Sequence, residues 1–219
     1  FASQLSTSAS GAVGVNFTLM AMIQAIGFTL GMGSGNYMSR MLGAKEQEKA
    51  QRACSTAVYT AFVFGLALAV LGIANINGLV RALGATETIA PYAKDYGKYI
   101  LIAAPYMTVS FVFNNHLRSQ GNAALSMIGI TTGGVLNVIL DPVLIFGFHM
   151  GISGAAIATI FSQFVSFTIL LVLVIRSKNV LKPLPKYYTF KGWVYKEILS
   201  AGMPTLGRQG LASAASVLL

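Results

Sequence analysis

No charged side chain occurs between Phe1 and Ser39. Nearly charge-free segments recur later in the chain, at about Cys54–Ala74, Tyr99–Asn115, Ala123–Phe148 and Ile152–Ile175. A transmembrane helix needs only about 20 mostly apolar residues. Charged residues make up 10% of this chain, whereas a soluble domain carries about 25%. A removable signal peptide does not explain segments that recur to the end. The sequence therefore predicts an all-α fold, a polytopic transmembrane helical bundle.

The charge-free opening is too long for a single membrane span. Ser6–Gly11 is small and polar, so we expect it to connect one helix end, Phe1–Leu5, to a first complete span at about Val13–Met38. A last span is expected to begin near Ile198. The chain begins with Phe rather than Met and stops at Leu219 within an apolar segment. We therefore expect it to be a fragment of a longer protein.

Lys and Arg residues are concentrated in alternate connections between the predicted spans. The net charge is +9, but the basic residues lie between apolar segments rather than on one polar surface with aromatic residues, so we expect no nucleic-acid partner. Connections rich in Lys and Arg remain on the cytoplasmic side of a membrane. We therefore expect a multi-pass protein of the plasma (inner) membrane whose cytoplasmic connections carry Arg40, Lys45, Lys49, Arg52, Arg118, Arg176, Lys178, Lys182, Lys186, Lys191 and Lys196.

The basic segment Lys178–Lys196 is also rich in aromatic residues. It contains Tyr187, Tyr188, Phe190, Trp193 and Tyr195. Basic and aromatic side chains together suit a segment that lies at the level of the lipid headgroups. A solvated linker is the alternative, and the sequence leaves both interpretations open.

The sequence contains no arrangement typical of an enzyme or of a metal site. Cys54 is the only cysteine, which excludes an intrachain disulfide and a Cys-based metal site. His116 and His149 are too far apart for a known metal-binding motif, and the sequence has neither a Walker A motif nor a G-x-S-x-G motif. We therefore expect no enzymatic activity, no cofactor and no resident metal.

Asp141 is the only acidic residue deep within a predicted span. An ionised carboxylate at the centre of a membrane helix costs ~2.5 to 3.5 kcal/mol on insertion scales, so such a residue is a functional candidate. Asn137 lies four residues earlier, on the same helical face. Pro142 lacks an N–H group and frees the carbonyl of Val138, so a kink is expected beside the acid. The hypothesis is that Asp141 and Asn137 share a proton or cation. The alternative is an Asp that only ties helices together.

Four further polar residues within the predicted spans could line a cavity shared with Asp141. They are Gln24, Thr159, Ser162 and Gln163. Each of them alone is more often a hydrogen-bond partner between helices. Closely spaced glycines in the first complete span, from Gly27 to Gly35, indicate close helix packing.

Several short motifs occur in the order and spacing of a known transporter family. They are Gln24-Ala25-Ile26-Gly27, Ser39-Arg40-Met41-Leu42-Gly43-Ala44, Leu117-Arg118-Ser119-Gln120-Gly121 and Asn137-Val138-Ile139-Leu140-Asp141-Pro142. With these motifs the chain resembles the multidrug and toxic compound extrusion (MATE) family over nearly its whole length. The resemblance implies a protein of twelve helices in two six-helix lobes. Residues 1–176 would then be most of the N-terminal lobe, 177–197 a cytoplasmic or interfacial linker, and 198–219 the beginning of helix 7.

The resemblance also implies which residues form the site. In proton-coupled members, an Asn and an Asp on helix 5 and a Thr on helix 6 form a polar cluster with an Asp on helix 1. Asn137, Asp141 and Thr159 match the first three positions. The helix 1 Asp would precede Phe1, so the cluster is incomplete in this chain.

In sodium-coupled members, a Glu on helix 7 follows the Pro that corresponds to Pro204. Ala212 stands at the position of that Glu, with Arg208 nearby. This departure from the family pattern favours H⁺ over Na⁺ as the coupling ion.

The function implied by the resemblance is a secondary active antiporter that exports organic cations or drugs in exchange for H⁺ (or Na⁺) by alternating access. Its partners would be a small cationic substrate and the lipid bilayer. One alternative is a lipid-linked oligosaccharide flippase of related fold, which would be expected to line its cavity with Lys or Arg; none lies at the middle of a complete predicted span. Another alternative is a structural membrane subunit. The sequence does not indicate an oligomeric state.

Overall fold

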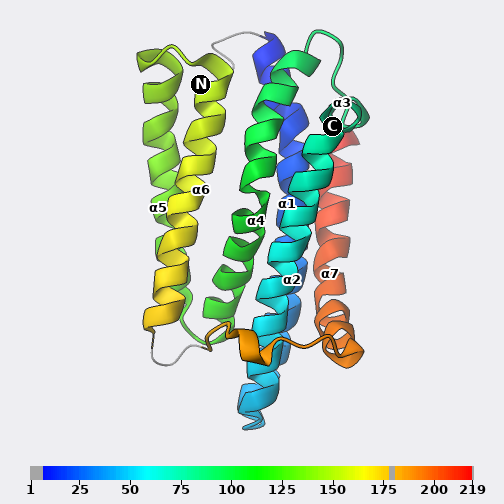
Figure 1. Cartoon of the computed structure of the whole chain (residues 1–219), viewed down its shortest axis with the longest axis vertical. Coiled ribbons are helices and arrows are strands. Elements are labelled where there is room, and N and C mark those ends of the chain that lie inside the picture. The colour runs from blue at the N-terminus through cyan, green and yellow to red at the C-terminus, as the bar shows by residue number, and fades with distance from the viewer. Residues whose placement is uncertain (1–6, 178–180, 219) are drawn as a thin grey trace.

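The chain folds into a bundle of long helices, and the described part contains no strand. The computed structural model describes residues 7–177 and 181–218 (Figure 1). The long helices are α1 (Thr7–Gly43), α2 (Gln47–Ala74), α4 (Ala90–Ser119), α5 (Ala123–Pro142), α6 (Gly151–Arg176) and α7 (Gly192–Leu218). The short segments are α3 (Ile76–Ala82), η2 (Val143–Gly147) and η3 (Pro185–Tyr187). The predicted all-α class is confirmed.

The first helix differs from the prediction at its beginning. The predicted span Val13–Met38 lies within α1, but α1 already includes Thr7–Gly11. The predicted connection at Ser6–Gly11 is therefore wrong for those residues, because short hydroxyl side chains can bond to the backbone of a helix without interrupting it. Ser6 and the predicted helix end at Phe1–Leu5 lie outside the described residues.

Three other helices begin earlier than predicted, and the first is α2, which begins at Gln47 rather than at Cys54. α4 begins at Ala90 rather than at Tyr99, and its first turns include the charged Lys94 and Lys98. α7 begins at Gly192 rather than near Ile198, so the last part of the predicted linker is helical. Charges mark where a helix leaves the hydrocarbon core, but the helix itself continues into the headgroup region, where long basic side chains reach water.

Pro142 ends α5 and is followed directly by η2, a π-helical turn over Val143–Gly147. Proline removes one backbone hydrogen bond and displaces the carbonyl one turn earlier. The wider π turn absorbs this mismatch. The expected disturbance beside Asp141 is therefore present as a change of helix type. The chain then turns between the two predicted spans that end at Phe148 and begin at Ile152, and His149 adopts a positive φ of 54° there.

The connections sort to the two ends of the bundle as the charges predict. The α1–α2 and α4–α5 connections and the linker before α7 lie at the lower end in Figure 1, whereas α3 and the α5–α6 connection lie at the upper end. The lower end carries most of the basic residues. By the positive-inside rule we expect this end to be cytoplasmic. It is called the cytoplasmic end below, and the upper end is called the outer end.

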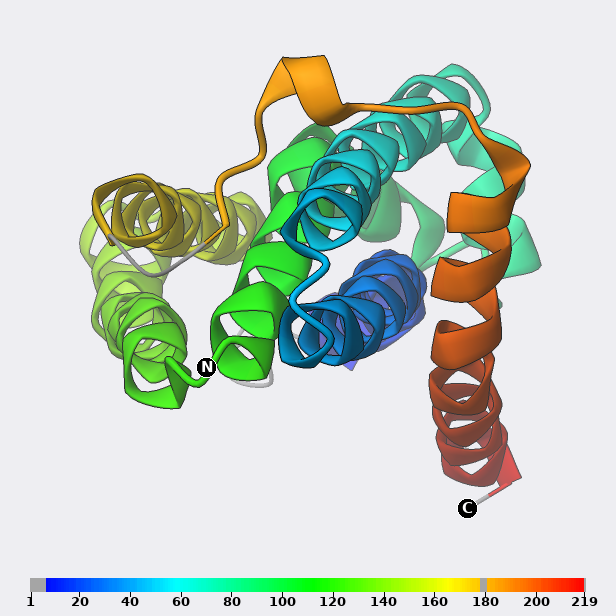
Figure 2. The ribbon, with the colours of Figure 1, turned by 90° about the horizontal axis from the view of Figure 1, so that it is seen from below.

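The outward surfaces of the helices are apolar, as a lipid environment requires. α1, α2, α6 and the joined segment α5–η2 are long and apolar enough to cross a membrane. On α2, large side chains such as Val63, Val70 and Leu71 are exposed. α4 falls outside this group by its composition. It packs against α1, α2, α5 and α6 in the middle of the bundle (Figures 1 and 2). A helix enclosed by its neighbours can carry more polar residues than a lipid-facing one.

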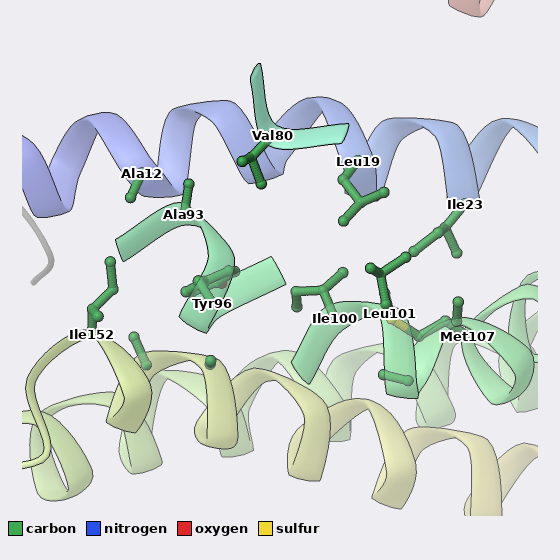
Figure 3. Packing of buried hydrophobic residues seen from close by; sticks show 14 of the residues in the cluster. Ala12, Leu19, Ile23, Val80, Ala93, Tyr96, Ile100, Leu101, Met107 and Ile152 are labelled. Atoms are coloured by element: carbon green, nitrogen blue, oxygen red, sulfur yellow. The ribbon is translucent and has the colours of Figure 1, made fainter. Parts of the chain in front are cut away.

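The core on the outer side lies where α1, α4 and α6 meet. Figure 3 shows Leu19 and Ile23 of α1 facing Ile100 and Leu101 of α4, whereas Ile152 of α6 lies at the other side of the cluster, near Ala93 and Tyr96. The predicted packing role of the glycines in α1 is confirmed. A Cβ atom at Gly27 would lie 2.7 Å from the Cβ of Phe111 on α4. On another face of α1, a Cβ at Gly33 would overlap the backbone carbonyl of Ile198 on α7, so these two backbones are in direct contact.

The linker is fixed to the bundle by hydrogen bonds to its backbone. The Leu181 N–H donates to Oε1 of Gln120 at 2.7 Å. The side chain of Gln51 donates to the carbonyl of Lys182, and the Tyr59 hydroxyl donates to that of Pro183 at 3.4 Å. The described part of the linker therefore lies against α2 and the α4–α5 turn.

Candidate functional site

Three helices contribute to one chain of polar contacts near the outer end, which we call the outer cluster: Asp141, Asn137, Thr159 and Tyr96. The Asn137 side-chain amide donates to Oδ1 of Asp141 at 3.4 Å and to Oγ1 of Thr159 at 3.4 Å. The Tyr96 hydroxyl lies 3.4 Å from the same Thr159 oxygen. The residues that the family resemblance implies are thus brought together across α5 and α6, and α4 adds Tyr96.

The direction of these hydrogen bonds follows from the donors available. Thr159 has one hydroxyl proton, and it donates that proton to the carbonyl of Ala155 at 2.9 Å. The Thr159 oxygen therefore accepts from Asn137, and Tyr96 must be the donor in its own contact. Asp141 lies at the end of this chain, where it accepts one hydrogen bond and keeps further acceptor capacity.

Asp141 has unused capacity for a proton or a cation. Its side chain is only partly buried, and the described residues form no ion pair with it. Within the described ranges, no three His, Cys, Asp or Glu residues come close enough together to hold a metal ion. Asp141 is thus a single carboxyl group with a neutral neighbour, an arrangement suited to exchanging one proton or monovalent cation.

A cavity of about 190 Å³ lies beside the outer cluster, between α1, α4, α5 and α6. Its polar lining comes from Gln24, Ser110, Asn114, Gln163 and Ser166, and its remaining lining from Phe28, Phe111, Ile130, Gly133, Gly134 and Leu170. No charged residue occurs in this lining, as far as the described residues form it. The rings of Phe28 and Phe111 lie 5.1 Å apart at one wall. The cavity can therefore offer amide oxygens and aromatic faces to a ligand.

The predicted site residues fall into two adjacent groups. Gln24 and Gln163 line the cavity, whereas Asp141, Asn137 and Thr159 form the outer cluster. Helix geometry links the groups, because Asn137 lies one turn beyond Gly133 on α5, and Thr159 lies one turn from Gln163 on α6.

Ser162 belongs to neither group. Its side chain is 2% exposed, and its hydroxyl has no hydrogen-bond partner among the described residues. It faces the α5–α6 contact, where a Cβ at Gly133 would lie 3.2 Å from the Ser162 carbonyl.

Tyr96 and Asn16 are two polar residues near the site that sequence reasoning missed. Tyr96 precedes the predicted start of its span at Tyr99, so the sequence predicts that it lies in a connection. Asn16 is fully buried in α1, and its amide donates to the carbonyls of Ala12 and Ala93 at 2.9 and 3.0 Å. Its Oδ1 has no partner in the described part of the chain. An Asn within a charge-free span is the available signal for this residue.

Known proteins with similar sequences include multidrug export proteins. The multidrug export protein MepA of Staphylococcus haemolyticus is 31% identical over 193 residues, which cover 88% of this chain and 43% of that protein. The MepA of Staphylococcus saprophyticus is 29% identical with the same coverage. The chain thus spans less than half the length of these curated relatives.

Solved structures of transporters share the fold. The outward-facing conformation of a multidrug resistance MATE family transporter of the MOP superfamily superposes with a TM-score of 0.88 at 28% identity, and the match covers 98% of this chain and 48% of that one. A MOP superfamily transporter from Pyrococcus furiosus, described as having a binding pocket of reverse polarity, also gives 0.88 at 26% identity, with the same coverage. The model of the MatE family matches residues 1–143. The chain therefore belongs to the MatE family and is a multi-pass membrane protein.

Proposed function

We propose that the full-length protein is a secondary antiporter that exports organic cations in exchange for H⁺ by alternating access. The observation that carries this proposal is the outer cluster, in which one carboxyl group, Asp141, is hydrogen-bonded to a neutral chain across three helices. The similarity to multidrug export proteins supports the export of small molecules.

The geometry supports a proton cycle at Asp141. When Asp141 is ionised, the Asn137 amide can donate to it, and through Asn137 it is connected to Thr159 of α6 and Tyr96 of α4. When Asp141 is protonated, its charge is lost and it becomes a hydrogen-bond donor as well. The two states therefore favour different arrangements of α4, α5 and α6. Such a difference is the kind of bias that shifts a population between outward- and inward-facing forms.

The cavity supports a cationic or neutral substrate rather than a pyrophosphate. Lys and Arg are absent from the described lining, whereas amide oxygens and the Phe28 and Phe111 rings are present. A flippase for lipid-linked oligosaccharides would need cationic groups for its phosphates. Export of a cation against the membrane potential needs an energy source, and one charge moving through 100 mV is worth ~2.3 kcal/mol.

The test is transport of a fluorescent organic cation by the full-length protein in proteoliposomes with an imposed pH gradient. We expect Asp141→Asn to abolish proton-driven export while the protein inserts normally. Asp95→Asn is the matched control, because Asp95 is an exposed acid at the outer end paired with Lys98 at 3.8 Å. Export by the Asp141→Asn protein at the wild-type rate would remove Asp141 from the mechanism. A Na⁺ gradient that drives export without a pH gradient would show the coupling ion to be Na⁺.

A further inference from the structure

At the cytoplasmic end, an open hollow of about 400 Å³ lies between the end of α1, the beginning of α2 and the beginning of α7. Its lining consists of Tyr37, Arg40, Met41, Lys49, Trp193 and Glu197. The helix ends that form it lie at the opposite end of the bundle from the C-terminal end of α5, the helix that carries Asp141 near that end (Figure 1). The hollow is much larger than the ~30 Å³ that one water occupies, so it can hold a polar group of several atoms.

The aromatic side chains place this hollow at the level of the lipid headgroups. The rings of Tyr37 and Trp193 lie 6.3 Å apart, and the Arg40 guanidinium lies 5.5 Å from the centre of the Tyr37 ring. Trp193 is 41% exposed, whereas the adjacent Val194 is fully buried in the bundle. The beginning of α7 is therefore fixed while the indole remains accessible. Trp and Tyr concentrate at membrane–water interfaces, where one part of the ring system is wet and another apolar.

Both cations in the hollow have exchangeable partners. Arg40 pairs with Glu197 at 2.9 Å, and the two side chains are 61% and 45% exposed. Lys49 pairs with Glu46 at 3.2 Å, and both are about half exposed. Exposed ion pairs of this kind contribute little to stability. A phosphate can accept two parallel hydrogen bonds from Arg, so it can compete with Glu197 for Arg40.

We propose that this hollow binds the headgroup of an anionic phospholipid of the cytoplasmic leaflet, with Arg40 and Lys49 holding the phosphate and Trp193 lying beside the glycerol backbone. The positive charge of the surrounding surface fits an anionic lipid. Of the 15 Lys and Arg residues, all lie in the predicted cytoplasmic segments except Arg81, Lys94, Lys98 and Arg208. Anionic lipids concentrate in that leaflet and attract basic segments next to the membrane. A lipid phosphate on Arg40 also replaces the Arg40–Glu197 bond between α1 and α7, so bound lipid loosens this contact.

The test uses quenching of tryptophan fluorescence in the full-length protein by brominated lipids. Each variant is measured with and without Trp193→Phe, and the difference isolates the Trp193 signal. In wild type, we expect brominated phosphatidylglycerol to quench Trp193 more than brominated phosphatidylcholine does. Arg40→Gln and Lys49→Gln should each abolish the excess quenching of Trp193 by brominated phosphatidylglycerol. Glu197→Gln should increase it, because the substitution removes the competitor for Arg40.

The matched control is Lys186→Gln, which removes one positive charge from the same membrane face but outside the hollow. Lys186 packs over the Tyr187 ring at 4.8 Å, and we expect its variant to keep the full excess. Equal quenching by both lipids in wild type would overturn the proposal. If Lys186→Gln and Lys49→Gln reduced the excess quenching by phosphatidylglycerol equally, the proposal would also be overturned. Such a result would indicate a general effect of surface charge rather than binding in the hollow. If inorganic phosphate changed the Trp193 signal in phosphatidylcholine membranes as much as phosphatidylglycerol does, the ligand of the hollow would be a free anion rather than a lipid.

Discussion

The bundle holds polar side chains at two depths, and the two groups are bonded very differently. At the cytoplasmic side, the Ser34 hydroxyl lies 2.6 Å from Nε2 of His116, and the Cys54 sulfur lies 3.7 Å from Nδ1 of the same ring. These three side chains, called the cytoplasmic hub, are each at most 2% exposed. In the outer cluster the contacts between side chains are all 3.4 Å, and Asp141 is only partly buried.

The hub also extends into the backbone. The carbonyl of His116 accepts hydrogen bonds from Ser119 and from the Gln120 amide, both at 3.0 Å, and Gln120 in turn holds Leu181 of the linker. α1, α2, α4 and the linker are therefore joined at one point. A closed, fully bonded network rigidifies a structure, whereas a partly exposed carboxyl with spare acceptor capacity can change its protonation state. We infer that the hub holds the fold and that the outer cluster changes state during transport.

The largest effect is expected where α1 meets α7, close to the hub. Gly33→Ala should destabilise the protein by about 1–3 kcal/mol, because the new methyl overlaps the Ile198 carbonyl and a backbone cannot move aside easily. Gly14→Ala on the same helix is the control, since a Cβ there meets nothing within 4 Å. It should stabilise slightly through helix propensity. Thermal unfolding in detergent compares the two variants, and equal melting temperatures would contradict the close α1–α7 contact.

The next prediction compares two variants, one expected to change mainly the stability of the protein and the other mainly its transport. His116→Leu keeps a bulky side chain but removes the partner of Ser34, and it should lower the free energy of unfolding by about 1–2 kcal/mol. Transport per folded molecule should remain near the wild-type value. Asp141→Asn should show the reverse, with stability changed by less than about 0.5 kcal/mol and proton-driven export lost. Loss of transport per folded molecule in the His116→Leu protein would show that the hub is also part of the transport mechanism.

The sequence predicted the positions of most spans because apolar length and charge placement are local properties. Arg40 and Arg118 mark ends of α1 and α4, and Asn137, Asp141 and Pro142 indicate the site through helical spacing and the exclusion of charge from the membrane. The helix ends within the headgroup region were less predictable, because Lys94 and Lys98 fit either a loop or the first turns of a helix.

Contacts between helices could not be predicted in the same way. Nothing near Tyr96 in the sequence indicates that its hydroxyl reaches Thr159, since that contact depends on the packing of α4 against α6. The hub is a similar case, because Ser34, Cys54 and His116 come from three different spans. For Arg208 and Ala212, on which the choice of coupling ion partly rests, the side chains lie outside the described residues.

A smaller effect is expected from the middle of the outer cluster. Thr159→Val keeps the shape of the side chain but removes the oxygen that accepts from Asn137 and Tyr96. Interhelical hydrogen bonds in membranes average ~0.6 kcal/mol each, so the loss of two should slow export by about sevenfold. Thr159→Ser keeps the hydroxyl and should retain most of the rate. Equal export rates for the Val and Ser variants in proteoliposomes would show that the hydroxyl has no role.

The smallest effect is expected at Tyr96, and it tests whether the outer cluster includes α4. Tyr96→Phe keeps the buried ring, which is 5% exposed, and removes only the hydroxyl that donates to Thr159. One hydrogen bond of ~0.6 kcal/mol corresponds to about a threefold change in rate. If Tyr96 acts only through Thr159, the double variant with Thr159→Val should export no more slowly than Thr159→Val alone, because the shared contact is already absent. If the reductions in export rate caused by the two substitutions instead multiplied in the double variant, Tyr96 would act independently of Thr159. The cluster would then be confined to α5 and α6.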